Sequence, residues 1–174
     1  KADIKEPSQQ QLTNLLAHYN NGRFGDAEKL AISITEEFPQ HEHAWRILGA
    51  VLGVTGRNSE AVGVHQTAVA LSPQDASIHC NLGVALQELG RLDESEASLR
   101  QAIALKPDLA EAHNNLGATL KKLSKLDEAE ASYKQAIALK PDYATAHNNL
   151  GNTLRELGRF DESEVSLRQA IALK

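Results

Sequence analysis

The sequence contains no methionine, a single cysteine and few aromatic residues, and each scarcity narrows what the chain can be. With only Cys80, no disulfide can form within the chain, which fits a reducing compartment and favours a cytoplasmic location. Because aromatic residues make up 4% of the chain, a core must be built from Leu, Ile, Val and Ala. No apolar run approaches the roughly 20 residues that span a bilayer, so we expect no membrane partner. The absence of methionine predicts a processed or excised piece of a longer protein.

The overall composition is that of a folded, soluble protein. Apolar residues make up 41% and charged residues 24% of 174 residues, which argues against disorder. The formal net charge of −5 disfavours nucleic acid and anionic lipid as partners, because both repel an acidic surface.

A repeat of 34 residues organises the sequence. Prolines recur at Pro39, Pro73, Pro107 and Pro141, and glycines recur with the same spacing at Gly49, Gly83, Gly117 and Gly151. The last two units agree at 20 of their 31 shared positions. We therefore expect an N-terminal extension, 1–7, and one solenoid, 8–174, with units 8–41, 42–75, 76–109, 110–143 and 144–174.

Each unit predicts a pair of helices. In 110–143, Ala112, Leu116 and Leu120 recur at helical spacing and mark the buried face of the first helix. Ser124, where the other units have glycine, is predicted to end that helix. Asp127 is predicted to cap the second helix, with Glu130 completing a capping box. The same device is expected at Asp93 and Asp161, while Asp142 is expected to cap the following first helix. Small residues at unit positions 8, 20 and 27 should let neighbouring helices approach closely.

The pattern resembles the tetratricopeptide repeat: Trp or His at unit position 4, Leu at 7, Gly at 8, Leu at 11, Ala at 27 and Pro at 32. The resemblance implies an all-α fold, a right-handed α-α superhelix of about ten antiparallel helices in five repeats. The first unit departs from the pattern, with Leu15 at position 8 and Ile34 at position 27, as expected of an end cap. The last unit stops at Lys174, so its second helix should expose an apolar face, and we expect the natural protein to continue.

The resemblance also implies a concave groove lined by the first helices. Helical geometry assigns unit positions 2, 5, 6, 9, 12 and 13 to that side. On this assignment the groove is apolar towards the N-terminus, with Leu16, Ile47 and Val54, and polar towards the C-terminus. The candidate peptide-binding residues are Asn81, Asn114, Asn115, Asn148, Asn149, Asn152, Lys121, Lys122, Arg155, Arg46 and Gln87.

The asparagines are unusual because asparagine is a poor helix former. Two readings remain open. Their amides either hydrogen-bond a neighbouring repeat, or face an extended peptide, whose backbone an amide can pair with as donor and acceptor. We expect position 6 (Asn81, Asn115, Asn149) to face a ligand and position 5 (Asn114, Asn148) to serve mainly between repeats. The run of asparagines is similar to the tetratricopeptide region of O-GlcNAc transferases, where such a ladder holds the substrate backbone.

Other kinds of site find little support. The histidines at unit position 4, His79, His113 and His147, lie at helix contacts without carboxylate or thiol partners at ligand spacing, so we expect packing and no metal. No arrangement of catalytic residues and no cofactor motif stands out from the repeat. The carboxylate clamp of co-chaperone tetratricopeptide domains is also absent, since no unit supplies its basic pair at positions 2 and 6.

Three functions follow as hypotheses. The first is a non-catalytic scaffold that binds an extended peptide or helix of a partner protein in the groove. The second is the substrate-recruiting arm of a larger transferase, resembling a glycosyltransferase, whose catalytic domain would follow residue 174. The third is a self-assembly module that associates through the uncapped last helix.

Overall fold

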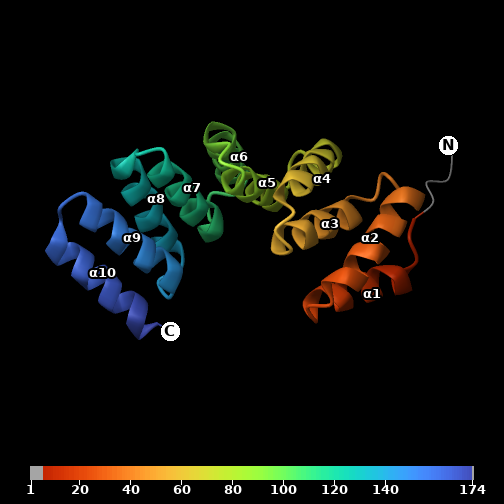
Figure 1. Cartoon of the computed structure of the whole chain (residues 1–174), viewed down its shortest axis with the longest axis horizontal. Coiled ribbons are helices and arrows are strands. Elements are labelled where there is room, and N and C mark those ends of the chain that lie inside the picture. The colour runs from red at the N-terminus through yellow and green to blue at the C-terminus, as the bar shows by residue number, and fades with distance from the viewer. Residues whose placement is uncertain (1–5, 174) are drawn as a thin grey trace. The chain divides into compact units, whose positions relative to one another are not determined.

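The structure is a computed structural model that describes residues 6–173. The regular secondary structure of these residues is entirely α-helical (Figure 1). The ten helices of the described residues are α1 (Gln9–Asn20), α2 (Phe24–Glu37), α3 (Glu42–Val54), α4 (Asn58–Leu71), α5 (Ala76–Glu88), α6 (Leu92–Leu105), α7 (Ala110–Lys122), α8 (Leu126–Leu139), α9 (Ala144–Glu156) and α10 (Phe160–Ala172). Each repeat contains one pair, so the predicted all-α class is confirmed. Residues 1–5 of the expected N-terminal extension lie outside the described residues.

The helices fall into two compact units, Lys1–Leu89 with α1 to α5 and Gly90–Lys174 with α6 to α10. Within each unit, consecutive helices pack against each other. First helices also contact the first helix of the next repeat, α1 with α3 and α3 with α5 in one unit, and α7 with α9 in the other. The first helices of a unit therefore form a row. The single solenoid over 8–174 stays a prediction.

The turn inside each repeat is set by one residue with a positive φ angle. Gly158 adopts φ 75° after α9, and Gly22, Gly56 and Gly90 do the same at their turns. Ser124 adopts φ 62° after α7, although this conformation costs a residue with a Cβ about 1–2 kcal/mol. The predicted helix ends are therefore confirmed, and Ser124 holds a strained backbone in a turn built for glycine.

The predicted capping boxes of the second helices are wrong. The N-cap of α8 is Lys125, which makes no side-chain cap, so Asp127 lies inside the first turn. Asp93 and Asp161 occupy the same place in α6 and α10, where their charge still favours the positive helix end. The N-cap of α9 is Tyr143 and not Asp142. A capping box does form at the start of α1, between Ser8 and Gln11.

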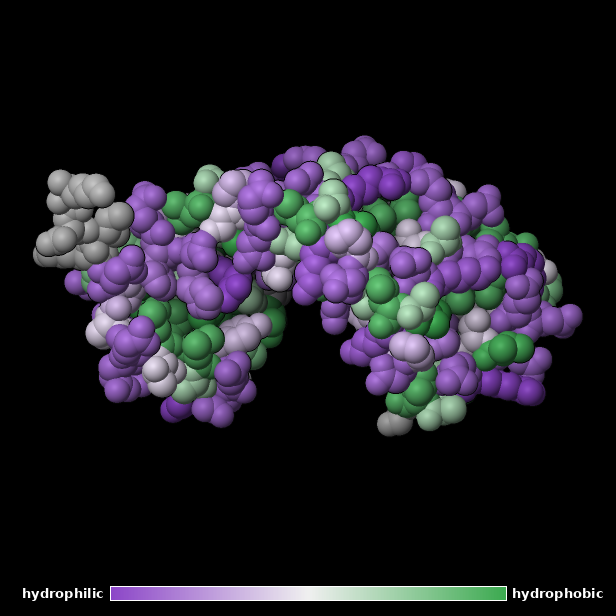
Figure 2. Space-filling view, turned by 180° about the vertical axis from the view of Figure 1, so that it is seen from behind, coloured by the Kyte–Doolittle hydropathy of each residue, from purple (hydrophilic) through white to green (hydrophobic). Residues whose placement is uncertain are grey.

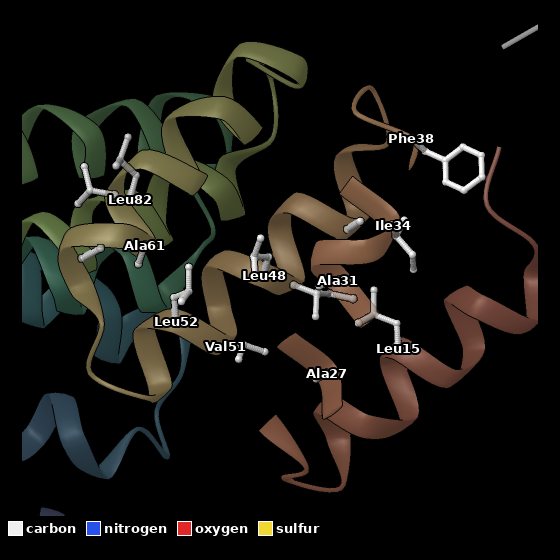
Figure 3. Packing of buried hydrophobic residues seen from close by; sticks show 14 of the residues in the cluster. Leu15, Ala27, Ala31, Ile34, Phe38, Leu48, Val51, Leu52, Ala61 and Leu82 are labelled. Carbon is white, nitrogen blue, oxygen red and sulfur yellow. The ribbon is translucent and has the colours of Figure 1, made fainter. Parts of the chain in front are cut away.

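Close packing inside each repeat depends on the glycine at unit position 8. A Cβ added to Gly117 would come within 2.7 Å of the Tyr133 ring, and one added to Gly151 would come as near to Leu167. The contacting residue belongs to the second helix of the same repeat. In the first repeat Leu15 replaces the glycine and joins the buried cluster of the N-terminal unit with Ala31 (Figure 3). The expected close approach of helices at small residues is confirmed.

A hydrogen bond ties each later first helix to the loop before it. The ring N–H of the residue at unit position 4 lies close to the carbonyl oxygen of the proline six residues earlier. The pairs are Trp45 with Pro39 (2.9 Å), His79 with Pro73 (3.0 Å), His113 with Pro107 (2.9 Å) and His147 with Pro141 (3.0 Å). This contact explains why either tryptophan or histidine stands at this position, since both present an N–H at the ring edge.

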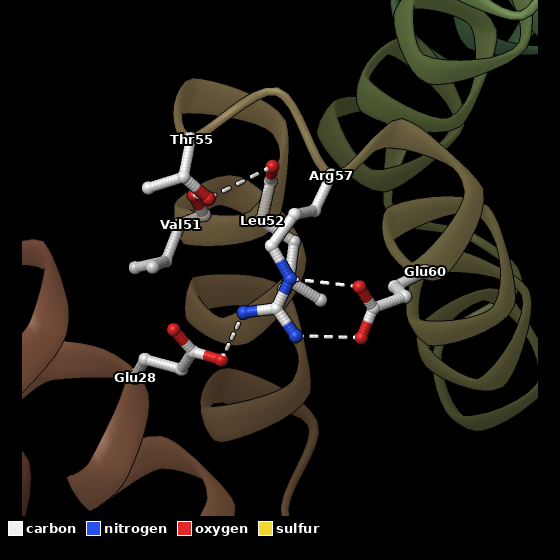
Figure 4. A network of polar contacts seen from close by, with 6 residues as sticks. All are labelled: Glu28, Val51, Leu52, Thr55, Arg57 and Glu60. Atoms are coloured by element: carbon white, nitrogen blue, oxygen red, sulfur yellow. Dashed lines mark hydrogen bonds and ion pairs between the residues drawn. The ribbon is translucent and has the colours of Figure 1, made fainter.

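Ion pairs link the second helices of neighbouring repeats. In the N-terminal unit Arg57, the N-cap of α4, binds Glu60 on α4 and Glu28 on α2 of the preceding repeat (Figure 4). In the C-terminal unit Arg159 reaches Glu130 in the preceding repeat at 2.6 Å. A hydrogen bond from Lys134, and to a smaller extent one from Arg159, lowers the pKa of the Glu130 carboxyl. These pairs fasten one repeat to the next outside the apolar core.

Candidate functional site

All candidate residues lie on first helices, as the repeat pattern predicts. In the N-terminal unit they are Arg46 on α3, and Asn81 and Gln87 on α5. In the C-terminal unit they are Asn114, Asn115, Lys121 and Lys122 on α7, and Asn148, Asn149, Asn152 and Arg155 on α9. We call the exposed side of these helices the first-helix face of each unit.

The asparagine amides of α7 and α9 contact one another. The Nδ2 of Asn149 donates to Oδ1 of Asn114 across the repeat boundary at 3.1 Å. The Nδ2 of Asn114 in turn donates to Oδ1 of Asn115 at 3.4 Å. Asn114 is only 5% exposed, Asn115 and Asn149 are half-buried, and Asn148 is exposed. The Asn114 amide, at unit position 5, therefore acts between repeats, and the Asn149 amide, at unit position 6, is its partner in that contact.

Charged residues lie near the C-terminal ends of the same two helices, α7 and α9. Lys121 pairs with Glu156 of the next repeat at 2.8 Å. Arg155 is exposed and donates to Oδ1 of Asn152 at 3.3 Å. Lys122 is exposed at the end of α7. The result is a polar face that combines primary amides with cationic side chains.

Arg46 occupies a separate polar cluster in the N-terminal unit. Its guanidinium donates to Nε2 of His43 at 2.6 Å and lies 3.5 Å from Oδ2 of Asp75. Burial lowers the pKa of His43, and the positive charge of Arg46 lowers it further. The neutral imidazole of His43 can therefore accept the hydrogen bond from Arg46.

Asn81 borders a hollow of about 430 Å³ on the first-helix face of the N-terminal unit. Gly53, Val54 and Val84 line it together with His65 from α4. Neither Gly53 nor His65 was among the sequence candidates. The sequence feature that could have indicated the hollow is the glycine at unit position 12, where the other units have large side chains: Tyr19, Gln87, Lys121 and Arg155. Ile47, expected on this face, is buried instead, because α3 contacts the first helices on both sides.

Within residues 6–173, no three His, Cys, Asp or Glu side chains are grouped so that they could hold a metal ion. None of the helices described is long and apolar enough to cross a membrane.

Three comparisons relate this arrangement to known proteins. A family model described as "Tetratricopeptide repeat" matches residues 74–142 and 108–174, and one described as "TPR repeat" matches 55–90. A search of curated proteins finds no match.

Solved structures share the fold over nearly the whole chain at low sequence identity. MamA 41-end from Desulfovibrio magneticus RS-1 is 16% identical, with a TM-score of 0.85, over 98% of this chain and 96% of its own. Another MamA crystal structure is 22% identical, with a TM-score of 0.80, over 90% and 92% of the two chains. YrrB, described as "a TPR protein with an unusual peptide-binding site", is 20% identical, with a TM-score of 0.75, over 97% and 87%. Together with the family match over more than half of its length, this shows that the chain belongs to the tetratricopeptide repeat family.

Proposed function

We propose that this chain is a non-catalytic protein-interaction module that binds an extended segment of a partner protein on its first-helix face. The observation that carries the proposal is the amide contact between α7 and α9. It holds poor helix formers in fixed orientation on a face that is only partly covered. YrrB, a similar solenoid, is described as having a peptide-binding site, which supports the same kind of ligand.

Asn149 is the asparagine best suited to bind a peptide backbone. Its amide donates one hydrogen to Oδ1 of Asn114, and its side chain is half-buried. A primary amide has two donor hydrogens and an acceptor oxygen, so one donor and the acceptor remain beyond that bond. Those two groups match the C=O and N–H of a peptide unit. The bond to Asn114 fixes the amide plane, which lowers the entropy lost when a peptide binds. Backbone recognition of this kind tolerates many ligand sequences.

The experiment begins with peptides selected by display on the native chain. Their affinity is then measured by calorimetry for the native chain, Asn149→Ala and Asn148→Ala. A neutral hydrogen bond contributes about 0.5–1.5 kcal/mol, so each loss should weaken binding by about 2- to 10-fold.

The matched control is Gln135→Ala, which removes an exposed amide on the second helix α8. Its affinity should equal that of the native chain. Equal affinities for all four proteins would refute the proposal, provided that circular dichroism shows each variant to be folded.

The substrate-recruiting arm of a transferase remains a narrower form of the same proposal. It uses the same asparagines, and the likeness to the O-GlcNAc transferase region supports it. Its distinguishing test is whether the selected peptides coincide with sites that a glycosyltransferase modifies. If none of the selected peptides contains serine or threonine, the transferase-arm proposal is refuted, and the broader proposal of peptide binding is unaffected.

A second candidate function, self-association, is favoured by the exposed apolar side chains of α10. Phe160, Val165 and Ile171 are 66%, 69% and 72% exposed, whereas Ile103 and Ile137, which match Ile171 in earlier repeats, are half-buried. Large apolar side chains that remain exposed are candidates for burial in an interface. Figure 2 shows hydrophobic patches interrupting the hydrophilic surface.

Analytical ultracentrifugation of Val165→Lys tests this second function. We expect the native chain to form oligomers whose population falls in Val165→Lys, while Val54→Lys, with the charge placed on α3, leaves it unchanged. A native chain that is monomeric at about 100 μM, or oligomers that survive Val165→Lys, would refute it.

A further inference from the structure

The hollow on the first-helix face of the N-terminal unit is a second feature with binding chemistry of its own. Its volume of about 430 Å³ falls within the range of ligand pockets in proteins. Ala50, Val54 and Val84 supply apolar walls, and Tyr19 lines it from α1. The polar groups that line it include Asn81, Glu88 and the His65 ring.

Glycine at position 53 opens this hollow. A Cβ built there would meet no heavy atom within 4 Å, so the space is not required by the packing of the helices. The other four repeats place a tyrosine, glutamine, lysine or arginine at this unit position. Glycine within a helix costs up to about 1 kcal/mol relative to alanine, so glycine in the last turn of α3 gives up some helix stability.

His65 adds an imidazole ring to the lining of the hollow, and the Nδ1 of that ring is buried beneath the surface. The side chain is 2% exposed, and no described residue lies within hydrogen-bond reach of its buried Nδ1. A buried polar atom without a partner is costly and uncommon in native structures. In the same unit position other repeats place Leu99, Tyr133 and Leu167, which bring no such cost.

The charges around the hollow select the kind of ligand. Burial lowers the pKa of His65 to about 4, so the imidazole is neutral at physiological pH. None of the described residues that line the hollow is a lysine or an arginine, so no cationic side chain is present to bind an anion. Anionic groups such as phosphates and carboxylates are therefore disfavoured. A neutral hydroxyl suits the site, because it can donate or accept and so pairs with either imidazole tautomer and with the Asn81 amide.

We infer that this hollow receives a tyrosine side chain of the bound partner segment, with the ring between Val54 and Val84 and the hydroxyl directed to Asn81 and His65. This specificity site rests on the proposed function, since the tyrosine belongs to the peptide on the first-helix face. Tyrosine combines a large apolar ring with a polar tip and is enriched at the energetic centres of interfaces.

The probe is p-cresol, which is the tyrosine side chain as a free molecule, and toluene is the same ring without the hydroxyl. Titration followed by amide NMR shifts should show saturable p-cresol binding at Gly53 and Asn81, with a roughly millimolar dissociation constant. Toluene should bind about 2- to 10-fold more weakly, because it forms no hydrogen bond.

The variant Gly53→Gln fills the hollow with the side chain that Gln87 supplies one repeat later, and it should abolish the shifts while raising helix stability. Gly63→Gln on α4, where a Cβ also meets open space, is the matched control and should bind as the native chain does. The inference is overturned if p-cresol gives no saturable shift, if Gly53→Gln binds it unchanged, or if toluene binds equally well. None of these results depends on the asparagine contacts of α7 and α9. The proposed function is therefore tested independently, by the calorimetry of the asparagine variants.

Discussion

Lowering the pH should destabilise the N-terminal unit through His65, and the structure gives the size of the effect. The imidazole is 2% exposed, and burial alone lowers its pKa from 6.5 to about 4. The unfolded chain then binds a proton before the folded chain does. The stability associated with neutral His65 is therefore complete above pH 6.5 and is lost as the pH falls towards 4.

The magnitude follows from the difference between the ordinary pKa of 6.5 and the pKa of about 4 in the folded chain. Each pKa unit corresponds to 1.36 kcal/mol, so protonation of the unfolded chain should remove about 3 kcal/mol between pH 6.5 and 4. That is a large part of the stability of a small repeat unit. The variant His65→Leu keeps a bulky residue against Gly49, as Leu167 does against Gly151, and carries no proton. It should also be about 1–2 kcal/mol more stable at pH 7.5, because a buried unpaired nitrogen is removed.

The assay is urea unfolding of the native chain and His65→Leu at intervals from pH 7.5 to 4. Acidic groups titrate equally in both proteins, so the difference in unfolding free energy isolates His65. The difference should grow by about 3 kcal/mol over that window. A constant difference, or an NMR titration that places the pKa of His65 at 6 or above, would refute the reasoning.

Three further predictions concern the turn, the ion pairs and the ligand. Ser124→Gly should stabilise the chain by about 0.5–1 kcal/mol in urea unfolding, because glycine adopts the positive φ without strain, while Gly158→Ser should do the reverse. Equal stabilities would contradict this. Glu130→Gln should lower the melting temperature at pH 7 and reduce its fall below pH 4.5, since the lowered pKa of Glu130 ties stability to its ionised form. An unchanged pH dependence would argue against the ion pairs. Finally, calorimetry should show that selected peptides bind equally well with a free or an amidated C-terminus, and a strong preference for the free carboxylate would reveal a clamp.

The repeat carried most of the information that the sequence could give about the fold. Helix pairs, turns at Gly158 and its equivalents, and the small residue at Gly117 follow from a period of 34 residues and local backbone rules. The second-helix caps were mispredicted because the start of α8 is placed before Asp127. An aspartate two residues inside the helix has nearly the same sequence signature as a cap.

The candidate face shows where sequence reasoning stops. A helical wheel placed Asn114 and Asn149 on the same side, but it could not show that one amide donates to the other across a repeat boundary. The hollow at Gly53 was missed because its volume depends on residues of four helices, including His65 on α4. Periodicity identifies a face of the molecule, whereas hydrogen-bond partners and cavities depend on which residues the packing brings together.

The central claim is that groove asparagines hold the backbone of a peptide, and a double-mutant cycle tests it most directly. Binding of a selected peptide is measured with and without N-methylation of each backbone amide, for the native chain and for Asn149→Ala. The account predicts a coupling free energy of about 1 kcal/mol between Asn149 and one peptide amide, because both changes remove the same hydrogen bond. Coupling near zero at every amide of the peptide would contradict it.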